Sequence, residues 1–443
     1  MDPLIIAIIV AVFTLIVLFS GIPIAFGLCF VSIVLLVSFE GFQMLDVFAE
    51  TFYAGLNSFV LLSIPMFILM GMAVANSPAG KDLYTGLDKW LWRVPGGLVI
   101  SNIGACSIFA ALSGSSPATC AAIGTMGIPE MRKRGYSDQI ATGTIAAGGT
   151  LGVLIPPSIV LIVYGIATGT SIGRLFLCGL VPGFMLAGMF AIWALIHSYF
   201  IDKDSAKALK NRTPPTLKEK LEVLPRILPF LAIIVGVLYV LYGGVATPSE
   251  ASGVGAFLVF VLIAVVYRIY QPKKIWNIVK VSMKESVMIM FIIAASYLFA
   301  FTLSQLYVTQ SLAQSMVELS SNKWVVFILI NIFLLIAGFF LPPVAVIVMT
   351  SAILLPVITQ LGFDPYWFAI VFTINMEIGL ITPPVGLNLY IIKGITPDVS
   401  LSEILKGSIP FMIIMALAIL ILCIFPEIVT WLPDKIMGKP LGY

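Results

Sequence analysis

Two short segments rich in glycine and proline carry most of the chemistry that this sequence offers. The first, "GGTLGVLIPPS", spans 148–158, and the second, "EIGLITPPVGLN", spans 377–388. Glycine weakens a helix by about 1 kcal/mol relative to alanine, and interior proline weakens it by about 3 kcal/mol, so each segment should break its helix. A break frees backbone carbonyls, which attract cations, and creates a new helix N-terminus, which attracts anions.

Two further breaks, which we call the tips, lie beside these segments, and the first of them is rich in hydroxyl groups. The first tip, "SGSSP", spans 113–117 and is followed by Thr119, and the second, "GFFLPP", spans 338–343. Carbonyl and hydroxyl oxygens from a tip and from the neighbouring broken helix could surround a hard monovalent cation. Two simpler interpretations of these residues remain open. The hydroxyl groups could cap helices, and the prolines could be ordinary kinks in membrane helices.

The elements that must position these residues are membrane helices. The chain has 443 residues, of which 60% are hydrophobic and 10% are charged, with a mean hydropathy of +1.10. This composition is typical of an all-α polytopic membrane protein. The five cysteines are scattered singly, and no soluble domain carries a basic cluster, so we expect no disulfide framework and no nucleic-acid partner. We predict spans near 4–20, 22–39, 56–75, 139–168, 172–200, 225–241, 249–267, 285–305, 367–392 and 407–425.

Two apolar stretches, 96–130 and 324–357, are too long for one span and contain the tips. We predict that both are re-entrant hairpins, because non-helical backbone at membrane depth must be buried in protein or line a cavity. This topology leaves only Arg174, Lys323, Lys435 and Lys439 outside and the other basic residues in the cytoplasm. The C-terminus then lies outside. The N-terminus also lies outside if residues 20–23 form a tight turn between two spans, but inside if they only kink one span.

Landmarks recur at a spacing of 227 residues. The two tips overlap at this shift, and Pro182 falls one residue before Pro410. Four further landmarks, Pro129, Gly135, Gly152 and Pro156-Pro157, fall on Pro356, Gly362, Gly379 and Pro383-Pro384. The charge distribution places the two copies in opposite orientations, so we predict an inverted repeat, the arrangement typical of secondary transporters.

These segments resemble the large membrane subunit of tripartite ATP-independent periplasmic (TRAP) transporters, within the ion transporter superfamily. The resemblance covers nearly the whole chain and is most specific in "ALSGSSPATCAAIGTMGIPEM", "GTIAAGGTLGVLIPPSIVLIVYG" and "GLITPPVGLNLYI". It implies sodium-coupled import of an organic anion, such as sialic acid or a four-carbon dicarboxylate, across the bacterial inner membrane. It also implies a periplasmic binding protein that delivers the anion, a separate four-helix membrane subunit, and an elevator mechanism.

The predicted division follows from the resemblance. We expect scaffold helices in 1–95 and in 171–323, the latter with a cytoplasmic linker at 201–224, and a last scaffold helix with its tail in 394–443. The moving transport domain would comprise 96–170, with hairpin 96–130 and broken helix 139–168, and 324–393, with hairpin 324–357 and broken helix 367–392. Lipid would surround the scaffold.

We predict one sodium site for each repeat. The expected sodium ligands are Ser113, Gly114, Ser115, Ser116, Gly149 and Gly152 in the first repeat, and Gly338, Pro342, Asn375, Gly379 and Thr382 in the second. The expected substrate contacts are Ser116, Thr119, Pro156, Pro157, Pro383 and Asn388. Glu377 is a further candidate, because buried intramembrane carboxylates are commonly functional, although it could instead pair with a backbone end or face water.

Other functions fit the residues less well. A membrane hydrolase would need a nucleophile and a base, but the chain has no G-x-S-x-G elbow, and its one histidine, His197, lies at a predicted helix end. A single histidine also argues against a transition-metal site. A channel could use the tips as a filter, but inverted repeats with broken helices favour alternating access. We therefore expect no enzymatic activity and no cofactor other than Na⁺.

Overall fold

The computed structural model describes residues 3–94, 96–197, 214–318 and 322–439, and this part of the chain is helical, without strands. Eight of the described helices are long and apolar enough to cross a membrane, or nine if a bent pair counts as one span. The chain is thus an all-α polytopic membrane protein, as the composition predicts.

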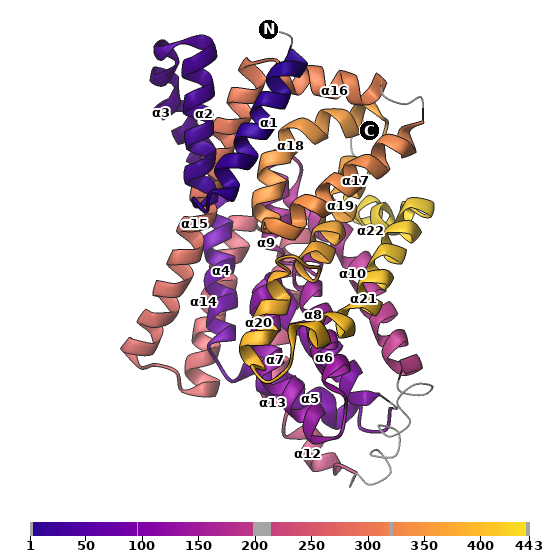
Figure 1. Ribbon diagram of the computed structural model, residues 1–443. Coiled ribbons are helices and arrows are strands. Elements are labelled where there is room, and N and C mark those ends of the chain that lie inside the picture. The colour runs from indigo at the N-terminus through magenta and orange to yellow at the C-terminus, as the bar shows by residue number, and fades with distance from the viewer. Residues whose placement is uncertain (1–2, 95, 198–213, 319–321, 440–443) are drawn as a thin grey trace.

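Of the N-terminal helices, α1–α4 lie at one side of the molecule and α5 lies at its lower end (Figure 1). Their bounds are α1 Pro3–Phe19, α2 Ile24–Glu40, η1 Phe42–Met44, α3 Leu45–Leu56, η2 Phe59–Leu62, α4 Ser63–Ala75 and α5 Ala79–Trp90. Helices α1 and α2 pack against each other on either side of a turn in which Gly21 has a φ of +84°. Residues 20–23 therefore separate two helices and do not kink one.

The span predicted at 56–75 corresponds to the helix Phe59–Ala75, in which η2 leads directly into α4. This helix bends by 58° from the preceding helix Phe42–Leu56. The break falls at Asn57-Ser58, where the backbone leaves helical geometry. Asparagine and serine favour such breaks because their side chains compete for backbone hydrogen bonds.

The first central group has the bounds α6 Gly97–Ser113, α7 Ser116–Lys133, α8 Asp138–Leu154 and α9 Ile159–Thr168. The second has the bounds α17 Lys323–Phe340, α18 Pro343–Gln360, α19 Pro365–Leu380 and α20 Leu387–Ile395. Each group starts with two helices that meet at a two-residue break, and it continues with a helix that is interrupted at a Pro-Pro pair. Helices α6 and α7 lie in the lower half of Figure 1, and α17 and α18 lie in the upper half.

The remaining helices are α10 Ile172–Ile196, α12 Leu217–Leu221, α13 Leu224–Tyr242, α14 Pro248–Tyr267, α15 Pro272–Gln305, α16 Val308–Glu318, α21 Leu401–Ile424 and α22 Glu427–Met437. Helix α15 has 34 residues and starts well before the span predicted at 285–305. It continues because residues 273–305 contain no glycine or proline to end it. The predicted linker 201–224 lies mostly outside the described residues.

Positions that are 227 residues apart occupy corresponding places. Gly135 and Gly362 both follow the second helix of a hairpin, with φ values of +83° and +73°. Pro129 lies inside α7, and Pro356 lies inside α18. Packing between the groups is also reciprocal, because α9 contacts α18 while α20 contacts α7.

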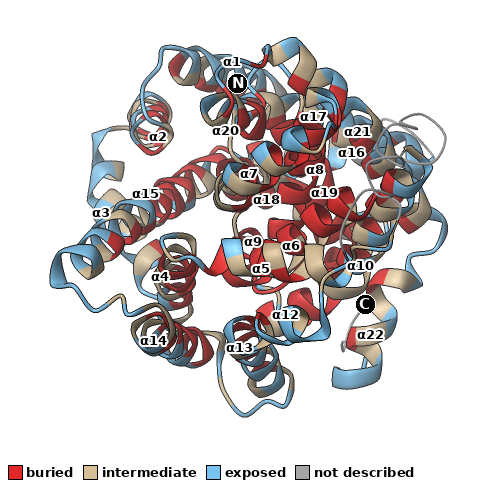
Figure 2. Ribbon diagram, turned by 90° about the horizontal axis from the view of Figure 1, so that it is seen from below, coloured by how far each residue is buried: buried red, intermediate tan, exposed pale blue. Residues whose placement is uncertain are grey.

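The core of the molecule is formed by the two broken helices. Every residue of α19 is buried, as is α8 from Ile140 to Leu154. In Figure 2 these helices lie in the buried centre, whereas α2, α3, α13 and α14 form an outer ring with exposed faces. Many exposed side chains of the outer helices are apolar, such as Ile8 and Val265. These faces suit contact with lipid or with another membrane protein.

Helix α21 crosses α8 at very short range. A Cβ atom on Gly143 would collide with the backbone of Gly407, and one on Gly407 would collide with the backbone of Gln139. On the opposite side, a Cβ on Gly179 of α10 would lie 2.5 Å from the Leu154 carbonyl oxygen. Glycine allows such contacts because it has no side chain, so α10 and α21 fit closely against α8.

Candidate functional site

The first tip and the first break lie against each other. Gly114 has a φ of +59°, and a Cβ atom on it would lie 2.8 Å from the Pro157 carbonyl oxygen. A Cβ on Gly152 would lie 3.0 Å from the carbonyl group of Ser115 and 3.1 Å from Thr119 Oγ1. Glycine at these two positions therefore lets the tip and the break approach each other closely.

The hydroxyl groups of the first tip have two kinds of partner. Ser115 caps α7 by accepting a hydrogen bond from the Ala118 amide at 3.4 Å. The side chain of this residue therefore has the capping role that the sequence left open. Thr119 Oγ1 donates to the Ser115 carbonyl at 2.8 Å and lies 3.0 Å from Ser113 Oγ. The lone pairs of these two buried hydroxyl groups remain able to accept from a donor or to bind a cation.

The second tip and the second break have the same relationship. A Cβ atom on Gly379 would lie 2.6 Å from the Gly338 carbonyl oxygen, and Pro342, inside the tip, is the N-cap residue of α18. Asn375 donates to Asn331 Oδ1 at 2.8 Å, while its own Oδ1 is buried and has no hydrogen-bond partner among the described residues. Thr382 donates to the Ile378 carbonyl at 2.6 Å.

One contact joins the two groups directly. Ser116 Oγ, at the start of α7, lies 2.9 Å from the Gly149 carbonyl oxygen and donates to Glu377 Oε2 on α19. Glu377 is 1% exposed, and Ser116 is fully buried. The sequence prediction did not place Glu377 among the ion ligands. The signal that singles it out is an acidic residue inside an apolar helix.

The predicted substrate residues lie in unlike surroundings. Pro156 and Pro157 are buried, whereas Pro383 is exposed. Asn388 lies in the first turn of α20, is fully buried, and has neither side-chain amide atom hydrogen-bonded within the described parts of the chain. The N-terminus of α20 has no side-chain cap. Uncapped amides and an unpaired side chain suit an anionic ligand at this end of the second break.

Basic residues near the site already have partners. Arg174 is buried at the start of α10, pairs with Asp434, donates to the Gly438 carbonyl at 2.6 Å, and lies over the Tyr366 ring. It thereby ties α10 to α22. Arg132, at the end of α7, pairs with Asp138 of α8 and with Asp398 in the turn after α20. Hydrogen bonding from Arg132 lowers the pKa of the Asp398 carboxyl.

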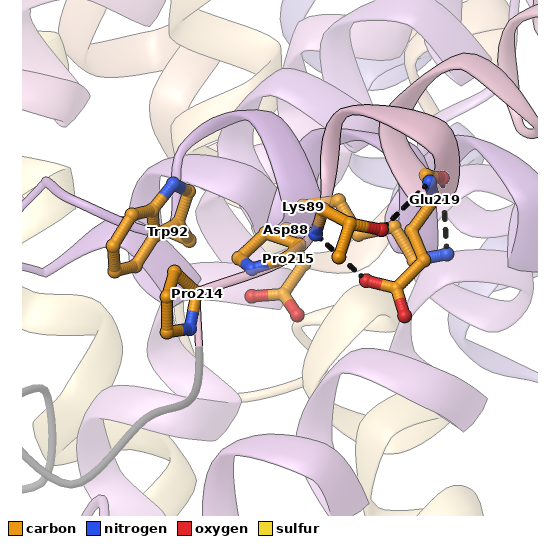
Figure 3. Close-up of a pocket in the computed structure, with 7 residues that line it drawn as sticks. Asp88, Lys89, Trp92, Pro214, Pro215 and Glu219 are labelled. Carbon is orange, nitrogen blue, oxygen red and sulfur yellow. Dashed lines mark hydrogen bonds between the residues drawn. The ribbon is translucent and has the colours of Figure 1, made fainter.

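A cavity of about 250 Å³ lies elsewhere, between α5 and the start of α12. Figure 3 shows its lining, in which Lys89 donates to the Glu219 carbonyl at 3.2 Å beside Trp92 and Asp88. None of the predicted ion or substrate residues lines it. We therefore do not place the substrate there.

Comparisons with known proteins agree with this architecture. The family described as "Tripartite ATP-independent periplasmic transporter, DctM component" matches residues 9–428. The C4-dicarboxylate TRAP transporter large permease protein DctM of Pseudomonas aeruginosa is 37% identical over 85% of this chain and 86% of its own. The protein of the same name from Vibrio cholerae is 35% identical over 95% and 96%. The crystal structure of the Alcanivorax borkumensis YdaH transporter has a similar fold, with a TM-score of 0.64 and 13% identity over 91% of both chains.

Proposed function

The chain belongs to the DctM component family of tripartite ATP-independent periplasmic transporters, as a large permease subunit, and from this premise we propose that it imports a small organic anion together with sodium ions. The apolar spans and the family place the protein in the inner membrane. The observation that carries the proposal is the pair of contacts in which a glycine of each broken helix meets the tip beside it.

The oxygen atoms at these two contacts suit sodium. At the first, the Gly149 carbonyl faces the Ser116 hydroxyl, beside the tip carbonyls and the hydroxyls of Ser113 and Thr119. At the second, the Gly338 carbonyl lies close to Gly379, and Asn375 Oδ1 is buried without a hydrogen-bond partner among the described residues. Hard cations prefer such oxygen ligands, and sodium bound there would join each tip to its broken helix.

The anion would bind between the two breaks. The uncapped N-terminus of α20 and the unpaired Asn388 amide offer hydrogen-bond donors on the side where Pro383 is exposed. The most similar relatives named above are C4-dicarboxylate permeases, which supports a four-carbon dicarboxylate as the first substrate to test. Sialic acid is the second.

Transport would follow an elevator mechanism, in which the two hairpins and two broken helices move as one body. The reciprocal packing of α9 with α18 and of α20 with α7 supports an inverted repeat within that body. The sequence predicts α10 and α21 as scaffold helices. Their close glycine contacts with α8 support assigning both of them to the transport domain instead. Helices α1–α5 and α13–α16 then form the scaffold, and both termini lie on the periplasmic side.

Two partners complete the proposed system. A periplasmic binding protein would deliver the anion, and a small membrane subunit would cover part of the exposed apolar face of the scaffold helices. The lone chain should therefore insert into a membrane without transporting.

Reconstitution in liposomes tests the proposal. With the small subunit, the binding protein and an inward sodium gradient, labelled succinate should accumulate, and uptake should rise with more than the first power of sodium concentration. Collapse of the gradient should abolish accumulation. Uptake that persists without any ion gradient, or without the binding protein, would contradict the proposal, and accumulation of sialic acid in place of succinate would change the substrate class.

A further inference from the structure

We propose that Glu377, in the second repeat, is a direct ligand of the sodium ion bound at the first tip, so that the first ion site is built from both halves of the chain. This inference rests on the proposed sodium coupling. It adds a carboxylate to a site for which the sequence predicts only hydroxyl and carbonyl oxygens.

Three oxygen atoms from three helices converge at Ser116. Its hydroxyl group lies 2.9 Å from the Gly149 carbonyl oxygen of α8 and contacts Glu377 Oε2 of α19. The hydroxyl has one hydrogen atom, so it can donate to only one of these two acceptors at a time. When the Glu377 carboxyl group is ionised, the other acceptor faces an oxygen without a hydrogen between them, and a cation at this place would satisfy all three.

The carboxylate also lacks a charge partner. Glu377 Oε1 is buried and has no hydrogen-bond partner among the described residues. In the same part of the chain, the ion pairs formed by Lys and Arg do not include Glu377. A buried and uncompensated carboxylate is strongly unfavourable, whereas a carboxylate that binds Na⁺ has no net charge.

The surrounding helices leave no room for the carboxylate to turn outward. Every residue of α19 is buried, and α8 is buried around Gly149. The oxygen atoms of Glu377 are therefore held at the first tip by packing. Ion binding there would connect α7 and α8 of the first repeat to α19 of the second, so the first tip could not become ordered independently of the second repeat.

Thermal unfolding of the purified, full-length chain in detergent tests this assignment without any transport. The unmodified protein should be stabilised by NaCl relative to choline chloride. The Glu377→Gln variant keeps the side-chain shape but loses the charge, so its half-saturating sodium concentration should rise by about tenfold or more. Glu377→Asp keeps the charge but withdraws it by one methylene, and should give an intermediate value.

The matched control is Glu285→Gln, which neutralises an exposed carboxylate on α15. This variant should leave the half-saturating sodium concentration unchanged. An unchanged half-saturating sodium concentration in Glu377→Gln would overturn the assignment while leaving sodium coupling intact. If Glu377→Gln does not fold, an unchanged half-saturating sodium concentration in Glu377→Asp would equally overturn the assignment. Absence of any sodium effect in the unmodified protein would overturn both the assignment and the proposed coupling.

Discussion

Gly379 of α19 lies so close to Gly338 of α17 that a Cβ atom on Gly379 would be 2.6 Å from the Gly338 carbonyl oxygen. Gly379→Ala should therefore push the second tip away from its broken helix. We expect a loss of about 1–3 kcal/mol in stability, as for other overpacked contacts, together with weaker sodium stabilisation. Thermal unfolding with and without sodium measures both.

Gly188→Ala is the control for this variant. Gly188 also lies in a helix, α10, but a Cβ atom there would meet no described atom within 4 Å. Alanine should be neutral at this position or stabilise the helix by up to about 1 kcal/mol. Equal behaviour of the two variants would show that the contact between Gly379 and Gly338 has no special role.

The first break should be more sensitive to backbone crowding than to the loss of a hydroxyl group. In Gly152→Val the new side chain would press on the Ser115 carbonyl and on Thr119, and its branched Cβ would stiffen the end of α8. Ser115→Ala removes only the cap of α7, which is typically worth about 1 kcal/mol. Initial uptake against sodium concentration should be lost in the valine variant and nearly normal in the alanine variant. The reverse order would contradict ion binding at this break.

Lys133 and Gln360 are exposed side chains at the ends of the two hairpins, and they are separated by the repeat spacing of 227 residues. In an inverted repeat, Lys133→Cys should react with a membrane-impermeant thiol reagent only from the cytoplasm, and Gln360→Cys only from the periplasm. Cys106, Cys120 and Cys178 are buried, so Cys29 and Cys423 are the natural thiols to replace first. Labelling of both positions from one side would rule out the inversion.

Gly71 of α4 is the point where a predicted scaffold helix meets the first tip. A Cβ atom on Gly71 would lie 2.7 Å from Ser113 Cα. Gly71→Ala should therefore displace Ser113 and slow uptake several-fold. Gly253→Ala on α14, where a Cβ meets no described atom within 4 Å, is the control. Normal uptake by Gly71→Ala would show that the tip does not depend on this contact.

The tips and breaks could be predicted from the sequence because their cause is local. The paired prolines and the left-handed glycines at 114, 135 and 362 interrupt helices wherever they occur. The contact of Ser116 with Glu377 could not be predicted, because it joins residues 261 positions apart and depends on how two repeats pack. The unequal exposure of Pro156 and Pro383 also depends on packing, since both prolines follow a glycine at the same spacing.

The close crossing of the backbones at Gly143 and Gly407 indicates where labels could be placed to measure helix motion during transport. Helix α21 fits against α8 at this crossing without intervening side chains, so we expect α21 to travel with α8. Helix α22 is tied to the neighbouring α10 through Arg174 and Asp434. If the transport domain moves as proposed, a fluorophore on α22 and a second one on α14 should report each transport cycle as a change in energy-transfer efficiency, in single molecules and without any label near the substrate.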